Sequence, residues 1–188
     1  MNEARIQRAL AIWINYRSHL CLPNVNGGLG LWSRGEMDFI AITGAGYIIE
    51  VEIKCTLADL RREWRSQVKI HKHRRAHTVD KGIRRFFICT PASIAQKARF
   101  EIEAEPLLAY AGILSVDDEA NYVKVLRPAQ NLKSARKLRP DEYMKIGHLA
   151  TMRFWSAPLL QQVGPRPDAG DVSVALIERA TPVIDVGE

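Results

Sequence analysis

The fold is decided by residues 36–54, which read EMDFIAITGAGYIIEVEIK. Two runs rich in apolar and β-branched residues, 37–43 and 47–54, flank the short connection Gly-Ala-Gly at 44–46. This pattern predicts two antiparallel strands joined by a tight hairpin. The second run is too apolar for the edge of a sheet, so we expect that strand to lie in the sheet's interior.

The hairpin also predicts which charged side chains share a face of the sheet. Residues two apart in a strand point the same way, so Glu50, Glu52 and Lys54 lie on one face. A three-residue connection places Asp38 directly opposite Glu52, with the two Cβ atoms roughly 5 Å apart. Glu36 shares its face with Asp38. We therefore expect four carboxylates and one ammonium on a single surface of the sheet.

Such a cluster needs a physical reason, because like charges opposed across strands are destabilising. A divalent cation supplies one: Mg²⁺ prefers oxygen ligands and is commonly held by one or two carboxylates, with a substrate phosphate completing its shell. Lys54 could orient or deprotonate an attacking water, or stabilise charge that grows on the phosphate. Hydrolysis of a phosphodiester needs these groups and few others. The alternative is a solvated edge strand with scattered charges.

The arrangement resembles the PD-(D/E)XK nuclease superfamily, with Asp38 on one strand and Glu52-Ile53-Lys54 on the next. Two later segments, Ala-Asp-Leu at 58–60 and Arg-Phe-Phe-Ile-Cys-Thr-Pro at 85–91, are similar to the compact MmcB-like families, nuclease-like proteins associated with DNA repair and mobile elements. The resemblance covers roughly residues 30–155 and is most specific over 36–72.

The resemblance implies an α/β fold with a restriction-endonuclease-like core, a central mixed β-sheet flanked by helices. It implies that Asp38, Glu52 and Lys54 are catalytic. Mg²⁺ or Mn²⁺ would be held by Asp38, Glu52 and the backbone carbonyl of Ile53, with Glu36 and Glu50 as further candidate ligands. Met37 stands where the motif's name has proline. Some members of the superfamily bind DNA without cutting it, so the resemblance leaves catalytic activity open.

The charge balance favours a polyanionic partner. The chain has 27 Lys and Arg against 21 Asp and Glu, a net charge of +6 and a pI near 9.4. A cationic stretch follows the carboxylates, on a helix predicted over residues 57–72, and this is where a phosphate backbone would run. A solvated helix face is the alternative. The candidate nucleic-acid-binding residues are Arg61, Arg62, Arg65, Lys69, Lys72, Arg74 and Arg75.

The rest of the chain predicts one domain over residues 1–163 and a C-terminal tail, 164–188, that we expect to be flexible. Helices are predicted over 2–20, 92–99 and 140–157, strands over 84–90, 109–116 and 122–126, and a loop over 23–30. The three cysteines form no CxxC pair, and we find neither a signal peptide nor an apolar run that could span a membrane. We expect a cytoplasmic protein, and a homodimer remains open.

Together these observations predict a Mg²⁺-dependent endodeoxyribonuclease that hydrolyses DNA phosphodiester bonds through a carboxylate-bound metal and an activated water. The alternative is a nuclease-fold DNA-binding module in which catalysis is weak or lost. A third candidate is an inhibitor or interaction protein that uses its basic face against a nuclease or a nucleoprotein complex.

Overall fold

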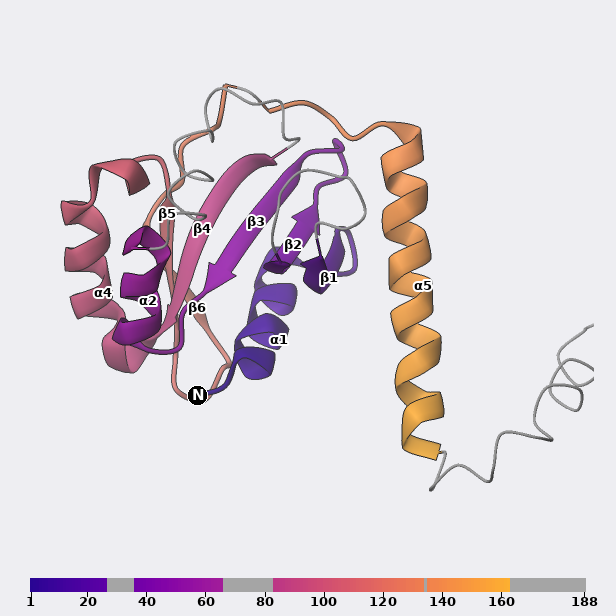
Figure 1. The fold of residues 1–188 in the computed structure, drawn as a ribbon, viewed down its shortest axis with the longest axis horizontal. Coiled ribbons are helices and arrows are strands. Elements are labelled where there is room, and N and C mark those ends of the chain that lie inside the picture. The colour runs from indigo at the N-terminus through magenta and orange to yellow at the C-terminus, as the bar shows by residue number, and fades with distance from the viewer. Residues whose placement is uncertain (27–35, 66–82, 134, 163–188) are drawn as a thin grey trace, which may run out of the picture. The chain divides into compact units, whose positions relative to one another are not determined.

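The computed structural model describes residues 1–26, 36–65, 83–133 and 135–162. Contacts divide the chain into two compact units, Met1–Ile146 and Gly147–Glu188. The first unit is built on a six-stranded sheet in which spatial order follows chain order (Figure 1). Its strands are β1 (Leu20–Asn26), β2 (Glu36–Ile42), β3 (Ile48–Ile53), β4 (Ile83–Pro91), β5 (Gly112–Val116) and β6 (Val123–Arg127).

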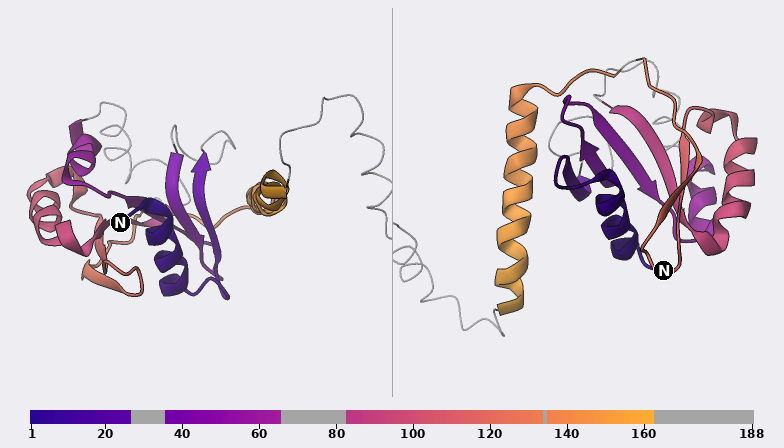
Figure 2. Two further views of the ribbon diagram at one scale, coloured as in Figure 1. Left: turned by 90° about the horizontal axis from the view of Figure 1, so that it is seen from below. Right: turned by 180° about the vertical axis from the view of Figure 1, so that it is seen from behind.

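The sheet is mixed. The pairs β1–β2, β2–β3 and β5–β6 are antiparallel, whereas β3–β4 and β4–β5 are parallel. The helices are α1 (Glu3–Ile14), α2 (Leu57–Arg65), α4 (Ala92–Ala104), the 3₁₀ helix η2 (Pro106–Leu108) and α5 (Pro140–Gln162), which begins in the first unit and ends in the second. These elements confirm the expected α/β class, with a central mixed sheet flanked by helices (Figure 2).

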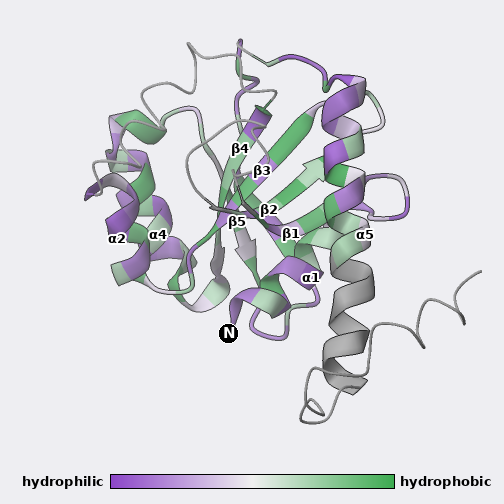
Figure 3. Ribbon diagram, turned by 45° about the vertical axis from the view of Figure 1, so that its right-hand side comes forward, coloured by the Kyte–Doolittle hydropathy of each residue, from purple (hydrophilic) through white to green (hydrophobic). Residues whose placement is uncertain are grey.

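The two faces of the sheet receive different helices because side chains alternate along each strand. Val51 and Ile53 of β3 belong to the hydrophobic cluster that α1 completes with Ile6 and Leu10. On the opposite face, Lys54 bonds to Glu63 of α2. Apolar residues are concentrated on the strands, whereas the helices carry much of the polar surface (Figure 3). In the part of the chain that the structure describes, no helix has the length and apolar character needed to cross a bilayer.

The hairpin has the predicted register. Phe39 pairs with Val51 and Ile40 with Glu50, and the strands close through the Thr43 N–H, which donates to the Tyr47 carbonyl at 2.9 Å. The connection turns where Gly46 adopts a φ of +86°, a conformation that glycine adopts without steric cost. The interior position of β3 is also confirmed, because it lies between β2 and β4.

Several predicted boundaries were wrong. The helices predicted over 92–99 and 140–157 extend to Ala104 and Gln162, and the strand predicted from residue 109 begins at Gly112. The loop predicted from residue 23 overlaps β1, which extends through Asn26 along β2. Pro23 is tolerated there because β1 is an edge strand, where a missing backbone donor can face away from the ladder. The first helix was expected to reach residue 20 but ends at Ile14, because Asn15 adopts a left-handed φ of 67° and caps it. The predicted tail, 164–188, lies outside the described residues.

Candidate functional site

The structure brings Asp38, Glu52 and Lys54 together at one end of the β2–β3 hairpin. Glu52 and Lys54 are buried, with 2% and 3% of their surface exposed, and Asp38 is partly buried. Backbone pairing of the hairpin extends as far as Phe39 and Val51. Beyond that pair, the Asp38 carboxylate accepts a hydrogen bond from the Ile53 N–H at 2.7 Å. The carboxylate of Asp38, on β2, therefore lies at the end of β3, beside the residue that precedes Lys54.

Lys54 is held between two carboxylates. Its Nζ lies 2.8 Å from Glu52 Oε1 and 3.2 Å from Glu63 Oε2. Burial lowers the pKa of Lys54, but the charges of Glu52 and Glu63 outweigh burial and bring the pKa above its usual value. Lys54 is therefore a fixed positive charge at neutral pH. This favours a stabilising or orienting role for Lys54 over proton abstraction.

Glu63 is the member of the cluster that sequence reasoning missed. It lies on α2 and is fully buried. The sequence signal was its spacing from Leu60, the other buried residue of this helix, since residues three apart on a helix are neighbours. The signal was missed because the arginines around Glu63 favoured the prediction of a basic, solvent-exposed helix.

Asp38 carries the clearest electrostatic perturbation in the cluster. Burial raises the pKa of Asp38, the charge of Glu52 raises it further, and Glu3 of α1 adds a smaller effect in the same direction. The Ile53 N–H and the Lys54 ammonium act against these but do not cancel them, and the pKa of Asp38 rises to about 7. Burial and the charge of Glu52 therefore favour the neutral form of Asp38 in the folded protein.

A polar network ties Asp38 to two other elements. The Gln7 side-chain amide of α1 donates to the Asp38 carbonyl at 2.9 Å, to Glu3 Oε1 at 2.7 Å and to Asn24 Oδ1 at 2.8 Å. An amide nitrogen has two hydrogens, so three acceptors share them. Asn24 has a positive φ of 49°, unusual within a strand. Gln7 thus links α1, β1 and β2 at Asp38.

The other two candidate ligands lie farther along the hairpin. Glu50 is fully buried, two residues before Glu52 on the same face of β3. Glu36 begins β2, and its backbone pairs with Asn26; its side chain is outside the described part of the structure. The part of Glu36 and Glu50 in a metal site remains a prediction.

The candidate ligands Asp38 and Glu52 suit Mg²⁺ or Mn²⁺ better than zinc. Among the described residues, no three side chains of the His, Cys, Asp or Glu type are arranged to hold a metal ion by themselves. A zinc site needs three or four protein ligands, whereas Mg²⁺ is commonly held by one or two carboxylates and keeps several waters. Asp38 and Glu52 therefore fit Mg²⁺ or Mn²⁺, and the carbonyl of Ile53 remains a predicted further ligand.

The basic residues predicted to contact nucleic acid divide into three groups. Arg61 is bound to Glu101 through two hydrogen bonds, of 2.9 and 2.6 Å, and Arg62 is bound to Asp59 at 3.1 Å. Arg65 is exposed at the end of α2. The remaining four, Lys69, Lys72, Arg74 and Arg75, lie outside the described residues. Much of the positive charge on the described part of α2 is thus balanced by local carboxylates.

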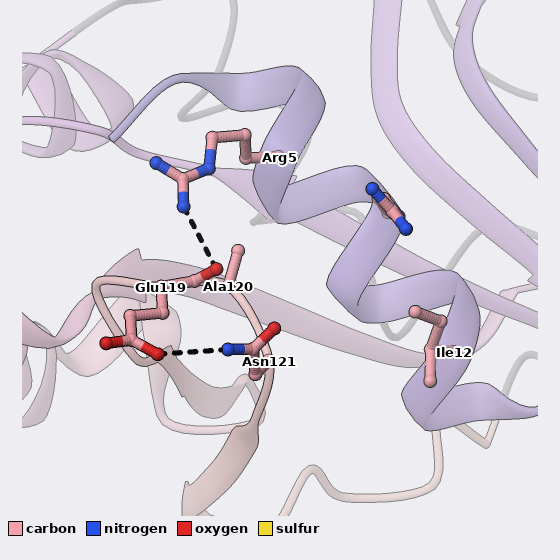
Figure 4. A pocket seen from close by; sticks show the side chains of 6 residues that line it. Arg5, Ile12, Glu119, Ala120 and Asn121 are labelled. Atoms are coloured by element: carbon pink, nitrogen blue, oxygen red, sulfur yellow. Dashed lines mark hydrogen bonds between the residues drawn. The ribbon is translucent and has the colours of Figure 1, made fainter.

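A shallow hollow of about 220 Å³ lies between α1 and the β5–β6 turn (Figure 4). Arg5 donates to the Glu119 carbonyl at 3.0 Å, and Asn121 donates to the Glu119 carboxylate at 3.1 Å. The Glu119 carboxylate makes the hollow a poor anion site. The hollow does not include Asp38 or its neighbours and is separate from the carboxylate cluster. Its lining residues are Arg5, Arg8, Ile12, Glu119, Ala120 and Asn121.

Comparison with known proteins supports the fold and gives no information on function. No protein-family model matches the chain, and no curated protein matches it. Among solved structures, the chain is similar to the SPO1766 protein of unknown function from Silicibacter pomeroyi, with a TM-score of 0.56 and 20% sequence identity. The match covers 89% of this chain and 98% of that one. At this identity the likeness concerns the architecture alone.

Proposed function

We propose that the chain is a Mg²⁺-dependent endodeoxyribonuclease with a PD-(D/E)XK-like core. The observation that carries this proposal is the cluster of Asp38, Glu52 and Lys54 at the end of two paired strands, where burial and the charge of Glu52 raise the pKa of Asp38. Lys54 bonds to Glu52 and Glu63, and Asp38 adds a further carboxylate beside them. A divalent cation held by Asp38 and Glu52 would offset the repulsion between their charges.

Each residue then has a distinct part in the chemistry. Asp38 and Glu52 would hold the metal, which supplies Lewis-acid activation of water and phosphate when bound. The Ile53 N–H fixes one oxygen of Asp38 by the hydrogen bond at 2.7 Å, so that the carboxylate is oriented before metal or substrate arrives. Lys54 contributes a permanent positive charge beside Glu52, and Glu63 holds that charge in place.

The decisive test is cleavage of supercoiled plasmid and branched DNA with Mg²⁺ or Mn²⁺, comparing the wild-type protein with Asp38→Ala. A matched control is Asp118→Ala, which removes the same charge from an exposed turn between β5 and β6. We expect the wild type and the control to cut and Asp38→Ala to be inactive. Cleavage that survives in folded Asp38→Ala protein would refute the assignment of Asp38.

One observation favours a second function, a DNA-binding module that does not cut. The Lys54 ammonium already bonds to both Glu52 and Glu63, so it neutralises part of the cluster without a metal. If this pairing has replaced the metal, Mn²⁺ titration followed by calorimetry will show no binding that depends on Asp38. The protein would then shift DNA in a salt-dependent manner and cut no substrate with any divalent metal.

A further inference from the structure

The segment that follows β6 returns to the sheet at the end opposite the carboxylate cluster. The Leu132 N–H donates to the Arg84 carbonyl at 2.9 Å, and the Leu138 N–H donates to the Gly46 carbonyl at 2.8 Å. Both leucines are buried. Figure 1 shows this segment, in orange, passing over the start of β4 and the β2–β3 hairpin. These two bonds hold Leu132 and Leu138 against the hairpin end of the sheet.

Two cations lie near one aromatic ring at this end of the sheet, and the returning segment supplies one of them. The Arg84 guanidinium lies 4.5 Å from the centre of the Tyr47 ring, and Lys137 Nζ lies 6.0 Å from the same centre. Arg85 donates to the Asn131 side chain at 3.0 Å, and Lys133 is exposed beside the Leu132 anchor. We call Tyr47, Arg84, Arg85, Lys133 and Lys137 the hairpin-end basic surface.

The cations of this surface differ from those of α2 in what balances them. No ion pair joins any of the four to a carboxylate within the described ranges; an aromatic ring and a neutral amide hold three of them in place. The nearby carboxylates already have partners, since Glu142 binds Arg136 and Asp141 lies 3.4 Å from Arg139. The hairpin end therefore presents uncompensated positive charge. On α2, by contrast, Glu101 and Asp59 bind two of the arginines.

We propose that the hairpin-end basic surface binds the phosphate backbone of duplex DNA at a distance from the carboxylate cluster. The inference rests on the proposed function and adds to it a second contact with the same substrate. Cations without carboxylate partners are suited to phosphate, because binding releases the counterions that condense on DNA. Stacking on Tyr47 holds the Arg84 guanidinium in position, 4.5 Å from the centre of the ring.

The length of β3 sets the distance between the two contacts. Tyr47 and Glu52 are five residues apart along a strand that rises about 3.3 Å per residue, which places their Cα atoms roughly 16 Å apart. Successive phosphates on one strand of duplex DNA advance about 3.4 Å along the axis. Tyr47 and Glu52 point to opposite faces because they are an odd number of residues apart, so this separation is a minimum. A substrate that touches both places must therefore extend over at least about five base pairs. The surface would hold a duplex whose scissile bond lies at the cluster.

The test compares two double variants that each remove two positive charges from exposed positions. Lys133→Ala/Lys137→Ala alters the hairpin-end basic surface, and Lys97→Ala/Lys124→Ala removes lysines on α4 and β6 as the matched control. Affinity for a duplex of about two helical turns is measured by fluorescence anisotropy in EDTA, which prevents cleavage, over a range of salt concentrations. Circular dichroism establishes that both variants are folded.

We expect Lys133→Ala/Lys137→Ala to weaken binding by about 10-fold or more at 0.1 M salt. It should also make the slope of log affinity against log salt shallower by roughly two, because each lost phosphate contact contributes about 0.9. The control should change affinity less than about 3-fold. Equal effects of the two double variants would overturn the inference, because they would show that only net charge matters.

These affinities, taken together with the plasmid-cleavage assay described under Proposed function, distinguish the inference from the proposed function. A wild type that binds duplex through this surface but cuts nothing with Mg²⁺ or Mn²⁺ supports the inference and refutes the nuclease. A wild type that cuts DNA, together with a Lys133→Ala/Lys137→Ala variant that binds as the control does, refutes the inference alone. A wild type with no affinity for duplex at low salt refutes the inference as well.

Discussion

Replacing Asp38 by asparagine removes one negative charge from the cluster and keeps the shape of the side chain. The asparagine carbonyl oxygen can still accept the hydrogen bond that the Ile53 N–H donates to Asp38 at 2.7 Å. The change therefore isolates the electrostatic contribution of the carboxylate. We predict that Asp38→Asn stabilises the metal-free protein at pH 8 and has little effect near pH 4.

The direction follows from the raised pKa of Asp38, about 7 in the folded protein against 3.8 for an unperturbed aspartate. Below the lower value the group is protonated in both states. Between the two values the unfolded chain releases its proton first, so the free energy of unfolding falls as pH rises. Above pH 7 the group is ionised in both states, so the free energy of unfolding falls no further. The difference between the two pKa values corresponds to a loss of at most roughly 4 kcal/mol in the free energy of unfolding. Because Asp38 is partly exposed, we expect Asp38→Asn to recover about 1–3 kcal/mol.

The assay is urea unfolding in EDTA at several pH values between 4 and 8, for the wild type, Asp38→Asn and Asp118→Asn as an exposed control. The advantage of Asp38→Asn over the wild type should grow with pH, while the control stays parallel to the wild type. A gain of this size corresponds to several degrees in Tm. A difference between Asp38→Asn and the wild type that is constant across the range would refute the reasoning. Added Mg²⁺ should stabilise the wild type and not Asp38→Asn.

Three further predictions concern stability. Lys54→Met removes the ammonium that bonds to two buried carboxylates, so the free energy of unfolding should fall by about 3–5 kcal/mol in urea titration. Lys124→Met, at an exposed site, should be nearly neutral. Gly112→Ala would place a methyl group into a neighbouring phenyl ring and 2.8 Å from a backbone nitrogen, whereas Gly44→Ala has open space. We expect a loss of about 1–3 kcal/mol for the first and almost none for the second. Hydrogen bonding to Arg136 lowers the pKa of Glu142 to about 2, so Glu142→Gln should destabilise the protein at pH 7 by about 1–3 kcal/mol. The difference in free energy of unfolding between Glu142→Gln and the wild type should shrink as pH falls from 4.5 towards 2, because Glu142 becomes protonated. Acid-unfolding curves measure this change.

The hairpin could be predicted because every signal for it is local. Alternation fixes which side chains share a face, the Gly-Ala-Gly connection fixes the register, and together these placed Asp38 near Glu52. The observed pairing of Phe39 with Val51 is the register expected. What alternation alone did not reveal is that the Asp38 side chain replaces a backbone bond at the end of the strand.

The parts that could not be predicted depend on contacts between distant segments. Glu63 enters the cluster because α2 turns that side towards β3, and a helix's charge pattern does not say which polar residue will be buried. Pro23 indicated a break, yet an edge strand tolerates it. Lys137 reaches Tyr47 because a segment some ninety residues later in the chain returns to the hairpin. No local pattern in either segment indicates that meeting.

The sheet's order has a consequence for how the protein is made. Each strand pairs with the strands just before and after it in the chain, so a nascent polypeptide can add strands in the order in which they leave the ribosome. The cluster draws on Asp38 through Glu63, a stretch of 26 residues spanning β2, β3 and α2. Short separations in sequence favour fast folding. We expect the charged site to assemble early in synthesis, and the return of residues 131–138 to the hairpin to be among the last steps.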